Sequence, residues 1–231
     1  MKTSLFKVLL LMIIIVTACT PPVVFDQAQP IDGESVNEIP ASYQGLYVCE
    51  SDSTLIIISD HIVYAQHEHY FIISTEGLEE REDCSLIENE VYLPGKDMCI
   101  PIEYIDEKTV KGYITDIDTL FIMDVNHVAK SYRGHLFLSK KLDNQEWAVS
   151  MLSHDETGNL LYRGITEDSD FRGINRITPM KEITRPSDRK RRFKITPDQT
   201  AFDLLINDPD IFIDCEYLMR VNLEVEQPDV F

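Results

Sequence analysis

The stretch His67-Glu68-His69 has the residue types and the spacing that best suit chemistry in this chain. If the stretch is extended, both imidazoles lie on the same face of a strand. With His61 or a cysteine nearby, they would offer the nitrogen and sulfur ligands that zinc prefers. Because the same pattern is common in polar turns, we keep His67 and His69 only as candidate metal ligands and expect no cofactor.

Motifs that carry catalysis are missing from the sequence. It contains no Gly-x-Ser-x-Gly, no His-Glu-x-x-His, no phosphate-binding glycine loop and no calcium-loop spacing of acids. The acidic run at 79–83 is typical of a solvated loop rather than of a general acid and base. We therefore predict no catalytic residue and favour a non-catalytic role, with the question of enzymatic activity left open.

Four cysteines offer a second kind of chemistry. Cys49, Cys84, Cys99 and Cys215 allow three pairings into two disulfides. Pairing Cys84 with Cys99 is attractive because Pro94 and Gly95 favour a hairpin between them, and Cys49 with Cys215 would then join the first and last strands. The alternative is four free thiols that pack as small apolar side chains.

A fifth cysteine, Cys19, follows an apolar segment at 8–16 that is preceded by Lys2 and Lys7. The residues Val16-Thr17-Ala18-Cys19 resemble the lipobox of bacterial lipoprotein signal peptides. This resemblance implies cleavage after residue 18 and a diacylglycerol on the Cys19 thiol, which would attach the chain to a membrane. The segment is too short for a spanning helix, which needs about 20 apolar residues, so an uncleaved anchor is the less favoured alternative.

The sequence then predicts four regions. Residues 1–18 are expected to form the signal peptide, 19–40 a proline-containing flexible tether, 41–223 an antiparallel β domain, and 224–231 a frayed tail. Since no acidic cluster follows Cys19, we expect a cell-envelope protein in the outer membrane that faces the periplasm, with the outer face as the alternative.

Charge limits the partners that such a domain can take. The chain has a formal net charge of −19, and loss of residues 1–18 leaves 19 basic and 40 acidic residues, a net charge of −21. A surface this acidic repels nucleic acid, so no nucleic-acid role is expected. The one basic island, residues 185–194, is interpreted as a solvated connector, or as a segment that docks on the protein's own acids or on an acidic partner.

Short runs rich in β-branched and aromatic residues predict an antiparallel β-barrel or β-sandwich. The expected strands cover 43–49, 54–59, 61–66, 70–75, 98–104, 109–115, 119–124, 135–139, 147–152, 160–165 and 211–221. Residues 154–159 predict a hairpin turn in which Gly158 takes a positive φ. One short C-terminal helix is expected, with Thr196 as its N-cap and Pro197 at its first position.

Two looser patterns bear on the fold. The series Gly45, 52–57 and 61–62 echoes Gly112, 117–122 and 127–128, which suggests a duplicated module or merely similar hairpins. The opening at 39–47 also resembles the start of lipocalin-like domains in uncharacterised lipoproteins of the Bacteroidota. That resemblance implies a barrel-like fold.

Two hypotheses for function follow from these observations. The first is a lipid-anchored envelope lipoprotein whose non-catalytic β domain binds a partner protein, a glycan or a small apolar ligand. The aromatic residues Tyr132, Phe137, Trp147 and Tyr162 would form a platform for the ligand unless they belong to the core. The alternative is an envelope hydrolase or another enzyme whose active residues are scattered along the chain.

Overall fold

The computed structural model describes residues 21–95, 97–142, 145–185, 188 and 190–221. Half of these residues (50%) are in strands and 11% are in helices. The strands form one largely antiparallel sheet that does not close into a barrel. The mainly β prediction is therefore confirmed, and the closed-barrel alternative is not found. None of the helices in the described residues has the length and apolarity needed to cross a membrane.

The chain divides into two compact units, which we describe separately. Unit 1 comprises residues up to 36, together with 124–153 and 161–215, and unit 2 comprises 37–123, 154–160 and the residues from 216 onward. The chain passes between the units five times, and three of these positions lie within strands, namely β12 (Trp147–His154), β13 (Leu160–Gly164) and β16 (Ile213–Arg220).

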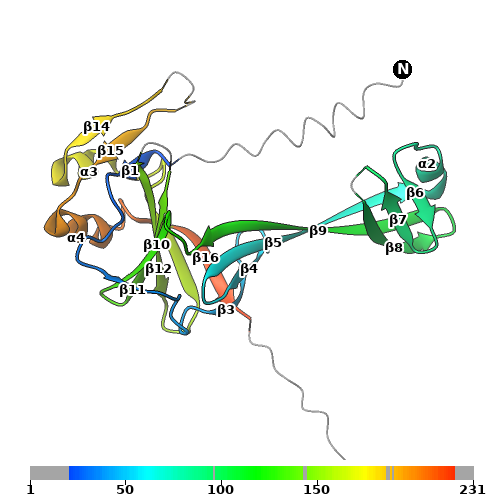
Figure 1. Ribbon diagram of the computed structural model, residues 1–231, viewed down its shortest axis with the longest axis horizontal. Coiled ribbons are helices and arrows are strands. Elements are labelled where there is room, and N and C mark those ends of the chain that lie inside the picture. Colours follow the sequence, from blue (N-terminus) through cyan, green and yellow to red (C-terminus); the bar gives the residue numbers. More distant parts are fainter. Residues whose placement is uncertain (1–20, 96, 143–144, 186–187, 189, 222–231) are drawn as a thin grey trace, which may run out of the picture. The chain divides into compact units, whose positions relative to one another are not determined.

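Unit 1 holds seven described strands around an aromatic core (Figure 1). The strands are β1 (Val23–Phe25), β2 (Glu34–Ser35), β10 (His127–Tyr132), β11 (His135–Lys141), β12 (Trp147–His154), β14 (Met180–Glu182) and β15 (Phe193–Ile195). Two helices, α3 (Phe171–Ile177) and α4 (Gln199–Asn207), contribute to the same core. At its centre, the Phe202 ring makes edge contacts with Phe25, Phe137 and Phe212.

Unit 2 is built from consecutive hairpins. Its strands are β3 (Gly45–Cys49), β4 (Leu55–Ile58), β5 (Ile62–Ser74), β6 (Ser85–Ile87), β7 (Glu90–Leu93), β8 (Met98–Asp106) and β9 (Thr109–Ile122), with helix α2 (Thr75–Glu79) between β5 and β6. The long strands β5 and β9 pair along their whole length and form a ribbon. Figure 1 shows β3 and β4 at one end of this ribbon, and β6, β7, β8 and α2 at the other.

The structure corrects the predicted tether at 19–40. Val23, Val24 and Phe25 are buried to 2%, 0% and 0% exposure, and β1 pairs with both β12 and β15. Three consecutive large apolar residues are costly to leave in water, so this segment joins the core instead of forming a spacer. Residues 1–18, Cys19 and the predicted tail at 224–231 lie outside the described residues.

Two boundaries also differ from the prediction. The runs at 61–66 and 70–75 belong to the single strand β5, and those at 109–115 and 119–124 belong to β9, because pairing continues through the polar residues between them. Helix α4 is capped by Asp198, whose side chain accepts a hydrogen bond from the Ala201 amide, and not by Thr196. The turn at 154–159 is confirmed, with Gly158 at φ 88°.

The proposed duplication has no counterpart in the fold. In the first copy, Gly45 and Leu55 lie on different strands, β3 and β4. In the second copy, Gly112 and Leu120 lie on the same strand, β9. The two segments therefore have different topologies, and their likeness is that of unrelated β sequences with acidic turns.

Candidate functional site

At the end of unit 2 that holds β6, β7, β8 and α2, one face of the sheet is exposed, while the opposite face is a core. Alternation along the ribbon directs Phe71 and Ile73 of β5 and Val110 of β9 to the inner face, where they pack with Leu78 of α2. The residues between them, Tyr70 and Ile72 on β5 and Lys111 and Tyr113 on β9, therefore point to the other face. We call this exposed side the outer face.

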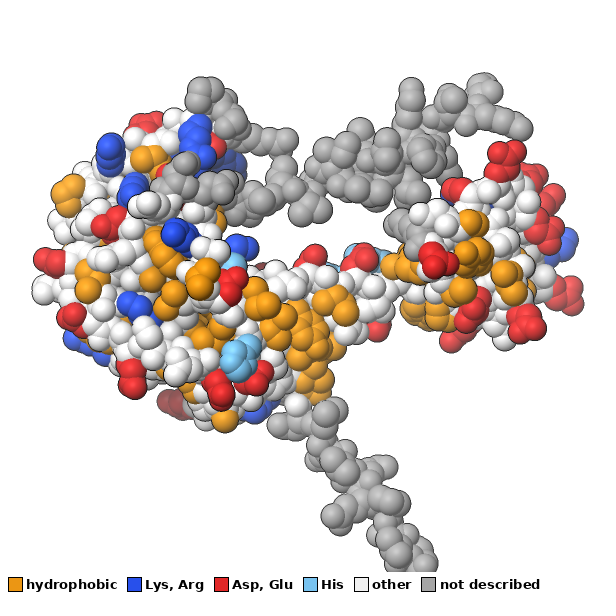
Figure 2. Space-filling model, viewed as in Figure 1, with side chains coloured by type: hydrophobic (Ala, Val, Ile, Leu, Met, Phe, Trp, Pro, Cys, Tyr) orange, Lys and Arg blue, Asp and Glu red, His pale blue; other side chains and the backbone are white. Residues whose placement is uncertain are grey.

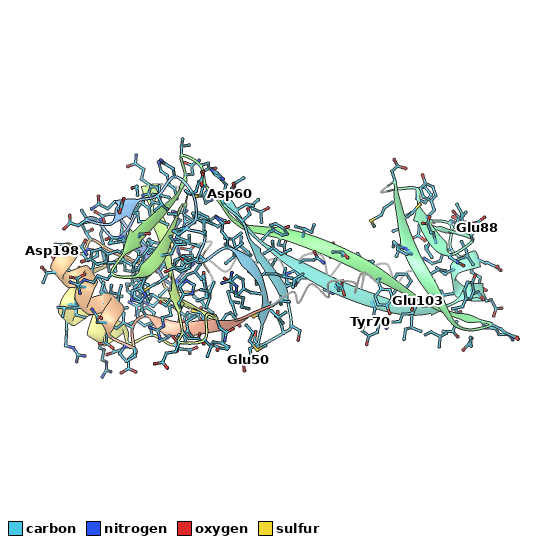
Figure 3. All side chains as sticks on the ribbon, turned by 90° about the horizontal axis from the view of Figure 1, so that it is seen from below. Glu50, Asp60, Tyr70, Glu88, Glu103 and Asp198 are labelled. Atoms are coloured by element: carbon cyan, nitrogen blue, oxygen red, sulfur yellow. The ribbon has the colours of Figure 1, made fainter. Side chains whose placement is uncertain are left out.

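A pair of tyrosines lies at the centre of the outer face. Tyr70 and Tyr113 are directly opposite each other across β5 and β9, and their exposed fractions are 66% and 38%. The Nζ atom of Lys111 lies 4.7 Å from the centroids of both rings. Its contact with Tyr113 raises the pKa of the Lys111 ammonium, which keeps it cationic and favours the cation–π arrangement. Tyr70 projects away from the ribbon in Figure 3.

Neighbouring strands extend the outer face. Lys111 pairs with Ile72, which is 56% exposed, and with Glu103 of β8. The pairing of β8 with β7 adds further side chains to the same side, namely Glu90, Tyr92, Cys99 and Pro101. Figure 2 shows acidic side chains around the end of unit 2 that holds β6, β7, β8 and α2. The result is an apolar and aromatic centre with a carboxylate rim.

His67 and His69 lie on one face of β5, as predicted, but each faces a carboxylate instead of a metal site. The Nε2 atom of His67 is 3.7 Å from Asp118, and that of His69 is 3.7 Å from Asp116. The two rings stack with their centroids 6.2 Å apart. Among the described residues, no three or more His, Cys, Asp or Glu side chains converge in a way that would hold a metal ion.

Four described cysteines, namely Cys49, Cys84, Cys99 and Cys215, are free thiols, so neither proposed disulfide is present in this structure. Cys84 is buried in the core below the outer face, with its thiol towards the Leu78 carbonyl, whereas Cys99 is exposed on the outer face. The Sγ atom of Cys49 is instead 2.9 Å from a carboxylate oxygen of Glu216. Burial, and then this contact, raise the pKa of the Cys49 thiol, which opposes its use as a nucleophile.

A serine–histidine pair is the strongest catalytic arrangement that we find. Ser153 Oγ lies 2.8 Å from Nδ1 of His135 in unit 1. However, Ser153 is only 4% exposed, and no carboxylate in the described part of the chain bonds to His135. Burial, and then Arg163, lower the pKa of His135. A substrate has no access to this hydroxyl, and the group that orients the base in serine hydrolases is missing from the described residues.

The basic island at 185–194 docks on the protein's own acids. Arg192 is 5% exposed and lies 3.1 Å from Glu146, which also accepts from Arg185 at 3.4 Å. Arg191 pairs with Glu182 at 2.6 Å. The interpretation as a solvated connector is therefore wrong for Arg192, because a buried guanidinium needs its carboxylate partner.

Phe137, Trp147 and Tyr132 form or border the core of unit 1, so these aromatic residues are not a binding platform. The outer face of unit 2 was not predicted from the sequence, in which Tyr70, Phe71, Ile72 and Ile73 follow one another. A run that is apolar at every position does not indicate which face is exposed.

The net charge is concentrated in unit 2. The segments 37–123, 154–160 and 216–221 contain 5 basic and 21 acidic residues, a formal charge of −16, whereas 20–36, 124–153 and 161–215 contain 14 basic and 16 acidic residues, a charge of −2. The outer face therefore belongs to a strongly acidic unit.

Comparison of the chain with protein-family models, with curated proteins and with solved structures gives no match.

Proposed function

We propose that this chain is a lipid-anchored protein of the bacterial cell envelope, attached through Cys19, whose unit 2 is a non-catalytic module that binds a basic partner protein. The observation that carries the proposal is the outer face, an exposed Tyr–Lys–Tyr and isoleucine surface on a unit with a formal charge of −16. The anchor is inferred from the lipobox resemblance of residues 16–19.

The composition of the outer face supports a protein partner. Tyrosine is enriched at protein interfaces because it offers a large apolar ring together with a polar group. Tyr70 and Ile72 are each more than half exposed, at 66% and 56%. Exposed apolar side chains grouped on one surface are typical of contact sites.

The charge of unit 2 supports a basic partner. Glu90 and Glu103 lie on the outer face itself. The negative electrostatic potential around unit 2 speeds the approach of a cationic protein and opposes the approach of acidic proteins. The sheet is not closed into a barrel, so a face of the sheet suits the role better than an enclosed cavity for a small apolar ligand.

Site-specific photo-crosslinking in the native envelope tests the proposal. A photoreactive amino acid replaces Ile72, and in a matched variant it replaces Leu204, which is also 56% exposed but lies on α4 of unit 1. We expect a discrete protein adduct from position 72 and none from position 204. The adduct partner should be basic, and its yield should fall severalfold when salt is raised to about 0.5 M, where screening is strong.

Equal adducts at the two positions, or an acidic adduct partner at position 72, would contradict the proposal. A glycan adduct in place of a protein would likewise show that the partner class is wrong.

A further inference from the structure

Two lysines face each other on the hairpin of β14 and β15 in unit 1. Lys181 and Lys194 are directly paired across the two strands, so their side chains point to the same side. Within the part of the chain that the structure describes, neither ammonium has a carboxylate within 4.0 Å, whereas Lys190 and Arg191 nearby pair with Glu167 and Glu182. Like charges placed directly opposite each other are destabilising, and an anion that contacts both would relieve the repulsion.

This hairpin lies beside the first described residues of the chain. β15 pairs in parallel with β1, and Lys194 is in register with Val24. The Phe193 amide donates to the Pro22 carbonyl at 2.8 Å, and Nε of Arg192 donates to the Pro21 carbonyl at 3.5 Å. Figure 1 shows β1 next to β15 and β14, and Figure 2 shows Lys and Arg side chains grouped over this part of unit 1.

The covalent chain limits how far this hairpin can be from Cys19. Only one residue separates Cys19 from Pro21, so their Cα atoms are at most about 7.6 Å apart, since consecutive Cα atoms are 3.8 Å apart. By the same geometry, Cys19 lies within about 19 Å of Val24, the residue that neighbours Lys194. A lipid on Cys19 would therefore bring the hairpin to the membrane surface.

We infer that the β14–β15 hairpin rests on anionic phospholipid headgroups, with Lys181 and Lys194 as the residues that contact the phosphates. The inference rests on the proposed lipid anchor at Cys19, which provides the proximity, while the unneutralised lysine pair provides the charge. A lipid surface is favoured over a protein partner because so short a connection leaves little space between β1 and the headgroups. Lysines near a membrane surface are attracted to anionic lipids.

Amine footprinting of the full lipidated chain in vesicles tests the inference. The chain is reconstituted in phosphatidylcholine alone, or in phosphatidylcholine with about a third phosphatidylglycerol, and the labelling rate of each lysine is read by mass spectrometry. We expect Lys181 and Lys194 to be labelled at least about threefold more slowly on the anionic vesicles, with the protection lost in high salt. Lys108, which is exposed in the turn between β8 and β9 of unit 2, is the internal control and should not change.

A Cys19→Ala variant separates the two possible failures. If this variant floats with vesicles as well as the wild-type chain does, the lipid anchor in the proposed function is wrong. If only the wild-type chain floats, but Lys181 and Lys194 are labelled equally fast on both kinds of vesicle, the anchor stands and the headgroup contact is wrong. Equal protection of Lys108 would also overturn the inference, because it would show a general effect of the vesicles.

Discussion

The carboxylate of Asp155 organises the turn after β12. It accepts hydrogen bonds from the amides of Thr157 and Asn159 and, at 2.6 Å, from the hydroxyl of Tyr217 on β16. The bond from Tyr217, followed by those from Thr157 and Asn159, holds the pKa of Asp155 well below its usual range. Hydrogen bonds to the charged form lower a carboxyl pKa in this way.

This arrangement predicts a specific pH dependence for the variant Tyr217→Phe. Because the pKa of Asp155 is lower in the folded chain than in the unfolded chain, its stabilisation is present above the unfolded value of about 3.9 and is lost as the pH falls through the folded value. We therefore expect the variant to be less stable than the wild type at pH 7, and the difference to shrink as the pH falls below about 4.

Urea unfolding at several pH values measures this difference. Tyr64→Phe on β5 is the control, because no hydrogen bond of its hydroxyl is found in the described structure. Equal stability of Tyr217→Phe and the wild type at pH 7 would show that the hydroxyl does not stabilise the charged Asp155.

The β5–β9 ribbon depends on a glycine that faces an aromatic ring. Gly112 of β9 is paired with Phe71 of β5, and a Cβ added at Gly112 would overlap the Phe71 ring. The ring therefore lies over the glycine and covers backbone that would otherwise be exposed, an arrangement that helps to pin strand register.

We predict that Gly112→Ala destabilises the part of unit 2 formed by α2 and β6–β9 by about 1–3 kcal/mol, as overpacking in a filled core commonly does. Hydrogen exchange of the β6–β9 amides would measure the effect. Gly95→Ala is the matched control, since nothing lies within 4 Å of a Cβ added there and Gly95 does not need a positive φ. Similar losses of protection in both variants would contradict the steric explanation.

Much of this element structure could be predicted from the sequence, for reasons that the ribbon makes clear. β-branched and aromatic runs located β3, β4, β8 and the two ends of β5, because side-chain type is a local property. The polar residues 67–69 suggested a break, yet β5 continues through them because β9 pairs there. β1 was missed for a related reason, since its partners β12 and β15 are more than 100 residues away.

At the scale of the molecule, the distribution of charge was not predictable. Each unit is assembled from separate segments of the chain, so a count along the sequence does not reveal that unit 2 has a formal charge of −16 and unit 1 a charge of −2. The outer face could not be predicted for a similar reason. Helix α2 covers only one face of the sheet in unit 2, and the sequence does not specify which face it covers.

The charge difference predicts that salt stabilises unit 2 more than unit 1. Self-repulsion among 21 acidic residues should weaken as the screening length falls from about 10 Å at 0.1 M salt to about 3 Å at 1 M. Trp147 is the single tryptophan and lies in unit 1, so its fluorescence reports the unfolding of that unit. Hydrogen exchange of the unit 2 amides reports the stability of that unit. An equal gain in stability of both units on addition of salt would contradict this prediction.

The burial of β1 has a mechanical consequence. β1 is hydrogen-bonded between β15, which runs parallel to it, and β12, which runs antiparallel. If a lipid on Cys19 holds the chain, a pull on the anchor along the strand axis reaches β1 after three intervening residues. Its hydrogen bonds on both sides would then share the load in shear, so the anchored end would resist extraction with the strength of the folded unit.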